Sequence, residues 1–284
     1  VNASDRVLAL YDYFTVETLA PEASIETFEG FDASDATVAV SGTSSLPGGT
    51  LTTDYGPPFI EVVDNASAVL PTVGGSKVIT YTGETDEELI INHDGLVGTS
   101  DVVYLAMAVR VNGLAASLAD QIVDILRVRD SSGNLYGVVL RNGVLRLAGT
   151  NGWNPTGNIT AVFTNDVSTI NDGQWRVLVA RLDQSNPANA SAKLWIMNTS
   201  TGVATLGADV SGFDVFAGPP VQMRFGATYI LPNASRADTS VSIDQVTFYN
   251  AALFSTDEDF LARVRLDFTG ITFLSADASW MMFE

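Results

Sequence analysis

Apolar and polar residues alternate along most of this chain with the period of a β-strand, in which successive side chains point to opposite faces. Runs of this kind predict eleven strands, at residues 77–82, 88–92, 101–111, 121–129, 135–141, 144–149, 160–163, 175–183, 192–198, 221–226 and 240–250. Residues 1–70 alternate less regularly, and we expect them to form an N-terminal arm and the first strands of the same domain. The pattern predicts an all-β protein.

Turn-forming residues separate several of these strands. Asn142-Gly143 stands between two alternating runs, and this pair favours a two-residue β-hairpin because both residues tolerate positive φ angles. The sequence DSSGN at 130–134 closes the preceding hairpin. Residues 121–149 are therefore predicted to form a three-stranded antiparallel meander, an arrangement found in sandwiches and barrels.

One segment near the C-terminus has helical rather than strand periodicity. Residues 255–265 are predicted to form a short helix with Ser255 as its N-cap and Glu258 at the third helical position. The apolar face of this helix would consist of Phe260, Leu261 and Val264.

The strand at 175–183 is apolar on both faces. Trp175, Val177 and Val179 lie on one face, and Leu178, Ala180 and Leu182 lie on the other. We expect a partner sheet on one side of this strand and a loop crossing the other. We also expect Trp175 to fill the space between the two sheets.

Several segments occur in the order typical of one fold family. An Asp-Gly turn precedes Trp175 and its strand, and then follow AKLWIMNTSTG (192–202), MRFGAT (223–228) and SIDQVTFYNAALFSTDEDFLARV (242–264). This series resembles the laminin G-like, pentraxin-like branch of the concanavalin A-like lectin/glucanase superfamily. Two positions depart from the usual pattern: Arg176 replaces a frequent histidine, and 198–202 replaces an Asp-Gly turn.

The resemblance covers residues 75–265, and it extends to residue 22 if ASIETFEGF forms an edge strand. It implies an antiparallel jelly-roll β-sandwich with one short C-terminal helix. We accordingly divide the chain into an N-terminal arm at 1–21, a concanavalin A-like domain at 22–266, and a C-terminal tail or added strand at 267–284.

The charge balance narrows the set of partners. The formal net charge is −19, and residues 1–100 hold sixteen acidic side chains against two basic ones. Such a surface repels nucleic-acid phosphates and anionic lipids, so we expect neither nucleic-acid binding nor membrane insertion. The longest uncharged apolar run, at 102–109, is far shorter than the roughly 20 residues that cross a bilayer. The chain contains no cysteine, which excludes disulfides, thiolate zinc sites and cysteine nucleophiles.

The sharpest catalytic candidate is the acidic sequence ETDEE. In it, Glu84, Asp86 and Glu88 have the spacing of laminarinase-like glycoside hydrolases, which share the fold that the resemblance implies. Alternate residues of a strand share one face, and retaining hydrolysis uses two carboxyl groups about 5 to 5.5 Å apart. Thr85 and Glu87 stand where those enzymes have apolar residues. We therefore expect an acidic, solvated hairpin loop here.

We expect no resident cofactor, with calcium as the one alternative, because oxygen-rich loops bind this ion. Proteins of the resembling superfamily often carry calcium, and the candidate ligands here are Asp86, Glu87 and Asp94. No EF-hand-like spacing connects these residues. His93, the one histidine, lies in the turn-like sequence INHDG and is expected to be a surface residue.

Aromatic residues in polar loops are the candidates for ligand contact, since an aromatic face stacks on the apolar face of a sugar ring. Trp153 stands between Asn151 and Asn154 in the polar segment 149–158, and Tyr229 is a weaker second candidate. The alternative for Trp153 is that its ring pins the loop to its own domain.

These features favour a non-catalytic, surface-exposed binding or adhesion module that recognises a glycan or a protein, extracellular or on the surface of a bacterium or phage virion. One alternative is a purely structural virion or appendage protein, with homo-oligomer or particle contacts through its N- and C-terminal segments. A second alternative is a glycoside hydrolase or polysaccharide lyase. The fold alone does not decide among them.

Overall fold

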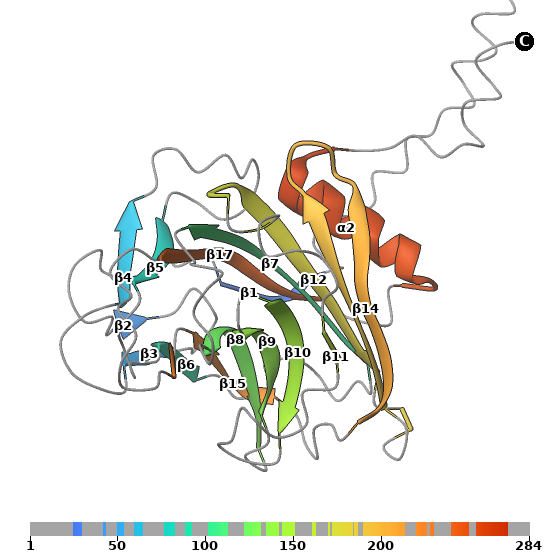
Figure 1. Cartoon of the computed structure of the whole chain (residues 1–284), viewed down its shortest axis with the longest axis horizontal. Coiled ribbons are helices and arrows are strands. Elements are labelled where there is room, and N and C mark those ends of the chain that lie inside the picture. The colour runs from blue at the N-terminus through green and yellow to red at the C-terminus, as the bar shows by residue number, and fades with distance from the viewer. Residues whose placement is uncertain are drawn as a thin grey trace, which may run out of the picture.

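The computed structural model arranges the chain as two packed antiparallel sheets with one helix on the outside (Figure 1). The structure describes residues 25–29, 42–43, 50–53, 60–64, 77–82, 89–92, 102–112, 122–131, 135–141, 144–150, 161–162, 170, 172–183, 185–186, 190–213, 220–225, 228–229, 240–249 and 254–271. The prediction of an all-β sandwich with a single short C-terminal helix is confirmed for this part of the chain.

The first sheet, which we call sheet A, has eight described strands. Their order is β14-β13-β12-β7-β17-β5-β4, and β1 pairs with β17 beside this path. The bounds are β1 Ile25–Glu29, β4 Ile60–Asp64, β5 Lys77–Thr82, β7 Val102–Asn112, β12 Trp175–Asp183, β13 Ala190–Asn198, β14 Ala204–Phe213 and β17 Ser240–Tyr249.

The second sheet, sheet B, has nine described strands in the order β11-β10-β9-β8-β15-β6-β3-β2, and β16 also pairs with β8. The bounds are β2 Gly42–Thr43, β3 Thr50–Thr53, β6 Leu89–Asn92, β8 Ile122–Asp130, β9 Leu135–Arg141, β10 Val144–Thr150, β11 Ala161–Val162, β15 Pro220–Phe225 and β16 Thr228–Tyr229. The predicted meander is confirmed, because β8, β9 and β10 are consecutive antiparallel neighbours and Val144 at the start of β10 pairs with Arg141 at the end of β9.

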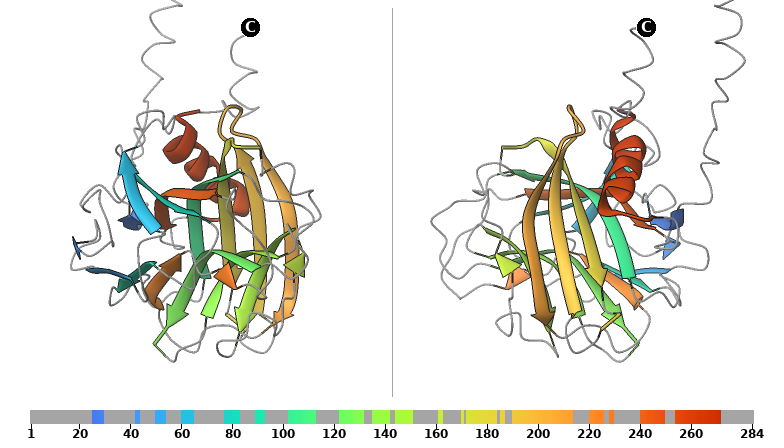
Figure 2. Two further views of the ribbon diagram at one scale, coloured as in Figure 1. Left: turned by 60° about the vertical axis from the view of Figure 1, so that its left-hand side comes forward. Right: turned by 90° about the vertical axis from the view of Figure 1, so that its right-hand side faces the viewer.

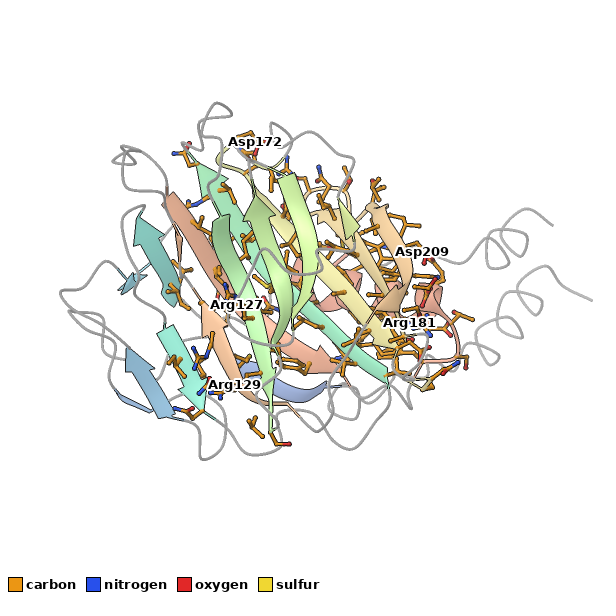
Figure 3. All side chains as sticks on the ribbon, turned by 60° about the horizontal axis from the view of Figure 1, so that its bottom comes forward. Arg127, Arg129, Asp172, Arg181 and Asp209 are labelled. Atoms are coloured by element: carbon orange, nitrogen blue, oxygen red, sulfur yellow. The ribbon has the colours of Figure 1, made fainter. Side chains whose placement is uncertain are left out.

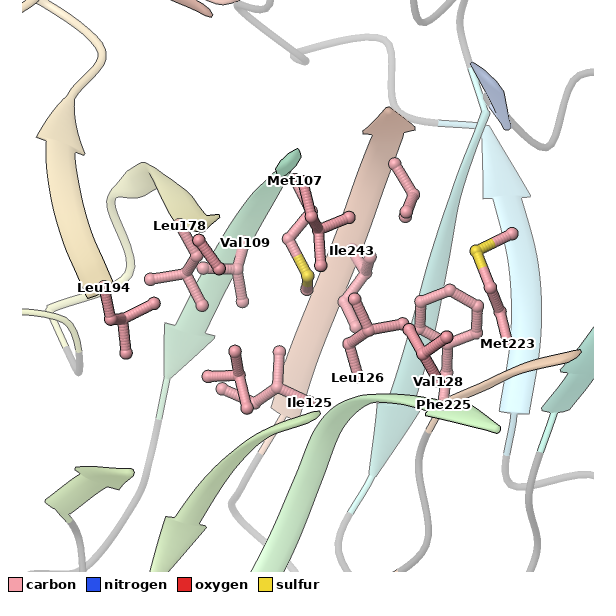
Figure 4. Packing of buried hydrophobic residues seen from close by; sticks show 14 of the residues in the cluster. Met107, Val109, Ile125, Leu126, Val128, Leu178, Leu194, Met223, Phe225 and Ile243 are labelled. Carbon is pink, nitrogen blue, oxygen red and sulfur yellow. The ribbon is translucent and has the colours of Figure 1, made fainter. Parts of the chain in front are cut away.

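The main hydrophobic core lies between the two sheets (Figure 4). Sheet A contributes Met107, Val109, Leu178 and Leu194, and sheet B contributes Ile125, Leu126, Val128, Met223 and Phe225. Most of these side chains alternate along their strands with residues of the outer faces, as the period of two requires; Ile125 and Leu126 are adjacent because the register of β8 shifts there. The alternation that predicted the strands is therefore the pattern of this core.

Helix α2, Asp257–Thr269, packs on the outer face of sheet A against β7 and β12 (Figure 2). Its N-cap is Thr256 rather than the predicted Ser255, because Thr256 and Asp259 exchange the two hydrogen bonds of a capping box. The helix also continues four residues past the predicted end, to a left-handed Gly270 whose N–H donates to the carbonyl of Leu266.

Helix α2 covers a second hydrophobic cluster, and this cluster corrects two expectations about the strand at 175–183. The cluster includes Trp175, Val177, Val179, Phe260, Leu261, Val264 and Phe268. Trp175 thus lies on the face of sheet A that the helix covers and not between the sheets. Side chains alternate along β12, and it is Leu178, not Trp175, that points toward sheet B. The expected cover on both faces is confirmed, but a helix supplies the second cover instead of a loop.

Gly137 on β9 allows an unusually close approach of two strands. The register of β8 and β9 shifts between Asp124 and Leu126, and a Cβ built on Gly137 would lie 1.9 Å from the carbonyl oxygen of Leu126. We expect Gly137→Ala to lower the free energy of unfolding by about 1–3 kcal/mol, since the strands must separate to admit the methyl group. Urea unfolding measures the change, and an unaltered midpoint would contradict it.

Candidate functional site

The site residues predicted from the sequence fall almost wholly outside the described part of the chain. Residues beyond it are Glu84, Asp86, Glu87, Glu88, His93, Asp94, Asn151, Trp153 and Asn154. Tyr229 lies in β16, where its backbone pairs with that of Ile122, and its side chain is not among those described. The catalytic, calcium-binding and ligand-contact roles of these residues stay predictions.

The outer face of sheet B, which points away from sheet A, carries a group of basic and amide side chains that we call the arginine face. It comprises Arg127 and Arg129 of β8, Gln222 and Arg224 of β15, and Asn92 of β6. Their neighbours along the strands lie in the main core, so alternation places these five on the opposite face. Figure 3 shows Arg127 and Arg129 along β8, well separated from Arg181 and Asp209.

Two hydrogen bonds order the amide side chains of the arginine face. Arg224 Nε donates to Gln222 Oε1 over 2.5 Å, and Gln222 Nε2 donates to Asn92 Oδ1 over 2.5 Å. Arg224 is buried, with 8% of its surface exposed, while Asn92 is exposed. Gln222 therefore links the buried Arg224 to the exposed Asn92. The two hydrogen bonds fix the orientation of both amide groups.

The register of the sheet brings like charges together on this face. Arg127 is directly opposite Arg224 across β8 and β15, and Arg129 is opposite Gln222. Like charges in directly opposed positions destabilise a β-sheet, and Arg127 and Arg224 each have a further interaction partner. Arg129, which is partly exposed, makes no hydrogen bond or ion pair with any described residue. The face thus concentrates positive charge without a described carboxylate opposite Arg129.

Three of the twelve arginines of a chain with a net charge of −19, Arg127, Arg129 and Arg224, therefore have side chains on this face. This local positive charge contrasts with the acidic character of the whole chain.

The outer face of sheet A has a different arrangement, in which charges are paired around the start of helix α2. Lys193 Nζ lies 2.7 Å from Asp257 Oδ2, and Arg181 Nη2 lies 2.7 Å from Asp183 Oδ2. Partial burial opposes ionisation of Asp183, but hydrogen bonds from Ser185 and the charge of Arg181 hold its pKa below the ordinary value. These contacts join the helix to β12 and β13. The charges of Lys193 and Arg181 are therefore already paired with carboxylates of the protein.

A buried polar group holds the other end of helix α2. The hydroxyl of Tyr249 donates to Asp267 Oδ2 over 3.0 Å, and Arg263 Nε donates to the same oxygen over 2.8 Å. Gln245, which has a positive φ of 51°, donates from Nε2 to the carbonyl oxygen of Asp267. Burial, together with the charge of Asp267, raises the pKa of Tyr249 well above its ordinary value. This group anchors the helix to β17.

Two further properties bear on possible ligands. Within the described ranges, no three histidine, cysteine or acidic residues gather closely enough to hold a metal ion. The helical part of the described chain is also too short and too polar to span a membrane. The arginine face is therefore the described surface with the most distinctive chemistry.

No family model matches the chain, and no curated protein matches it in sequence. Among solved structures, it is similar to botulinum neurotoxin type C, which depends on interaction with two ganglioside molecules to enter cells (TM-score 0.51, 12% identity, covering 81% of this chain and 48% of that one). It is also similar to the binding domain of botulinum neurotoxin DC in complex with rat synaptotagmin II (TM-score 0.52, 10% identity, 86% and 51% covered).

A third similar structure is the binding domain of Paraclostridial mosquitocidal protein 1, with a TM-score of 0.50, 14% identity, and coverage of 84% of this chain and 52% of that one. The chain thus spans about half the length of each of these chains. At such low identity the similarities establish a shared β-sandwich fold, in accord with the lectin-like fold that the sequence predicts. Assignment to the laminin G-like branch stays a prediction.

The sequence did contain a signal for the arginine face. In LRVR (126–129) and QMRF (222–225), apolar residues alternate with polar residues that include the three arginines. A strand of this pattern has an apolar core face and a basic outer face. The sequence does not reveal, however, that β8 and β15 are neighbours, because almost one hundred residues separate them. The sequence-based search for a site therefore concentrated on loops.

Proposed function

We propose that this chain is a non-catalytic binding module that recognises a glycan through the outer face of sheet B. The observation that carries the proposal is the arginine face itself, where ordered amides and arginines lie side by side on three neighbouring strands. Glycan sites need such fixed donors and acceptors, because hydroxyl groups are recognised through directional hydrogen bonds.

The similar structures support this proposal at the level of the fold. Each of them belongs to a toxin or a toxin binding domain, and one concerns interaction with gangliosides. A sandwich of this kind is thus used by other proteins as a recognition module. We extend the proposal to location: the module acts outside the cell or on the surface of a virion, where glycans are displayed.

A glycan array tests the proposal directly. We expect the protein to bind a defined subset of glycans, and we expect the double substitution Arg127→Glu and Arg129→Glu to abolish binding because it reverses the charge on the face. The control is Lys193→Glu, which makes a charge change of the same sign and half the size on the opposite sheet. Binding that survives the double substitution, or no binding to any glycan, would refute the proposal.

A further inference from the structure

We infer that the outer face of sheet A carries a second binding site, which takes a small hydroxycarboxylic acid of about the size of a sugar acid. In this site the guanidinium group of Arg110 binds the carboxylate of the ligand, and the side chains of Thr80 and Asn112 bind its hydroxyl groups. The main core separates this site from the arginine face, so the inference does not depend on the glycan site proposed for sheet B.

Six neighbouring positions on the outer face of sheet A are all polar, two each from β7, β17 and β5. We call them the polar grid: one row is Arg110, Ser242 and Thr80, and the next row is Asn112, Ser240 and Thr82. Residues that alternate with them, such as Val111 and Val241, lie in the main core, so the grid is directed away from sheet B. The next outward residues along β7 and β5, Ala108 and Val78, belong to the cluster under helix α2. The polar grid therefore begins where this apolar surface ends.

Arg110 has a defined orientation within the grid. Its guanidinium carbon lies 5.1 Å from the centre of the Trp175 ring, an attractive cation–π contact, and its Nη2 donates to Ser242 Oγ over 3.2 Å. The same hydroxyl oxygen lies 3.0 Å from Thr80 Oγ1. Ser242 is buried, whereas Arg110 and Thr80 are partly exposed and Asn112 is exposed. Ser242 is therefore a positioning residue, and the other three side chains can contact a ligand.

The charge of Arg110 has no acidic partner among the described residues. The other described basic side chains of sheet A and helix α2 each lie 3.7 Å or less from a carboxylate oxygen, and they are Arg176, Arg181, Lys193, Arg263 and Arg265. The whole chain has 33 acidic side chains and 14 basic ones. Because a partly desolvated charge is stabilised by a counter-charge, an arginine without one is unusual in so acidic a chain. The carboxylate of a ligand would supply this counter-charge.

The chemistry of the polar grid fits a carboxylate that carries neighbouring hydroxyl groups. A guanidinium group presents paired N–H donors that match the two oxygens of a carboxylate, and hydroxyl and amide side chains both donate to and accept from hydroxyl groups. Adjacent strands lie about 5 Å apart and alternate residues about 7 Å apart, so the grid has roughly the dimensions of one monosaccharide. Register places Glu61 beyond Thr80, on β4, and its negative charge favours a ligand whose carboxylate lies at the Arg110 end.

An NMR titration with glucuronate, glucose and acetate tests the inference. We expect glucuronate to bind most tightly, because it alone offers both a carboxylate and several hydroxyl groups. The indole N–H of Trp175 reports on the site, since it is buried without a hydrogen-bond partner and its ring lies against the Arg110 guanidinium. We expect glucuronate to shift the signal of this N–H and to leave that of Trp195, on β13, unchanged.

Three substitutions assign the contact to particular side chains. Arg110→Gln should weaken glucuronate binding about tenfold, the loss expected for charge-assisted hydrogen bonds. The matched control is Arg176→Gln, which makes the same charge change on the neighbouring strand at a residue already paired with Asp172, and it should bind like the unchanged protein. Ser242→Ala should weaken binding about threefold, and Ser242→Thr should restore it because threonine retains the hydroxyl that orients Arg110.

Several outcomes would overturn the inference: no binding of glucuronate, affinity for glucose or acetate equal to that for glucuronate, or unchanged glucuronate binding in Arg110→Gln. The double substitution Arg127→Glu and Arg129→Glu, on sheet B, should leave the glucuronate shift at Trp175 unaltered. Failure of this titration and failure of the glycan array are thereby distinguishable. Melting curves without ligand verify that each variant folds.

Discussion

Replacing Phe260 with alanine is expected to lower the free energy of unfolding by about 3–5 kcal/mol, the range for deleting a fully buried aromatic side chain. Phe260 has no exposed surface. Its ring centroid lies 4.3 Å from that of Tyr104, 5.4 Å from that of Phe254 and 5.5 Å from that of Tyr249. Truncation would leave a cavity bounded by these three rings, which belong to different segments and close up only in part.

Guanidinium chloride unfolding measures this loss, and Leu266→Ala provides the control on the same helix. The side chain of Leu266 is 38% exposed, so its truncation is expected to cost less than about 1 kcal/mol. Both substitutions replace a large side chain with alanine in α2, so their effects on helix propensity are small and comparable. An equal loss of unfolding free energy in the two variants would contradict the prediction, because it would mean that the buried cluster does not hold the helix on the sheet.

Replacing Asp267 with alanine is expected to cost a similar amount, about 3–5 kcal/mol, because it removes one member of a buried charged pair. The carboxylate has 7% of its residue surface exposed and accepts hydrogen bonds from both Tyr249 and Arg263. Without it, the Tyr249 hydroxyl loses its acceptor in a fully buried position and Arg263 loses its ion pair with Asp267. Chemical unfolding at neutral pH measures the effect.

Glu258→Ala is the matched control for this charge. Glu258 lies in the same helix, and its carboxylate is 3.7 Å from Arg265, but its side chain is 76% exposed. Exposed ion pairs contribute about 0–1 kcal/mol, so we expect the control variant to retain nearly full stability. If Glu258→Ala lowered the free energy of unfolding as much as Asp267→Ala, the effect would come from removing a negative charge from the helix and not from disrupting the buried polar group.

Much of the fold was predictable because strand alternation is a local property. The strand at 175–183 was predicted with the bounds that β12 has, and the meander formed by β8, β9 and β10 followed from its turn residues. β14 was missed because ATLGADVSGF, at the edge of sheet A, alternates weakly. An edge strand needs less apolar surface, so its sequence carries less of the signal.

The position of Trp175 shows what the alternation of apolar and polar residues along the chain cannot predict. The sequence establishes that both faces of β12 are apolar, but not which face meets sheet B and which meets the helix. That choice depends on α2, whose docking is set by residues more than eighty positions away. The arginine face has the same origin, since its rows exist only once β8, β15 and β6 are neighbours.

The separation of the two outer faces has a consequence for how this sandwich can diversify. The helix and its cluster secure sheet A from one side, while the arginine face lies on sheet B with the main core between them. Residues on the outside of β8, β15 and β6 can therefore vary without disturbing the attachment of α2. The protein thus has the layout of a scaffold with one interchangeable surface, on which new ligand preferences can be selected at little risk to folding.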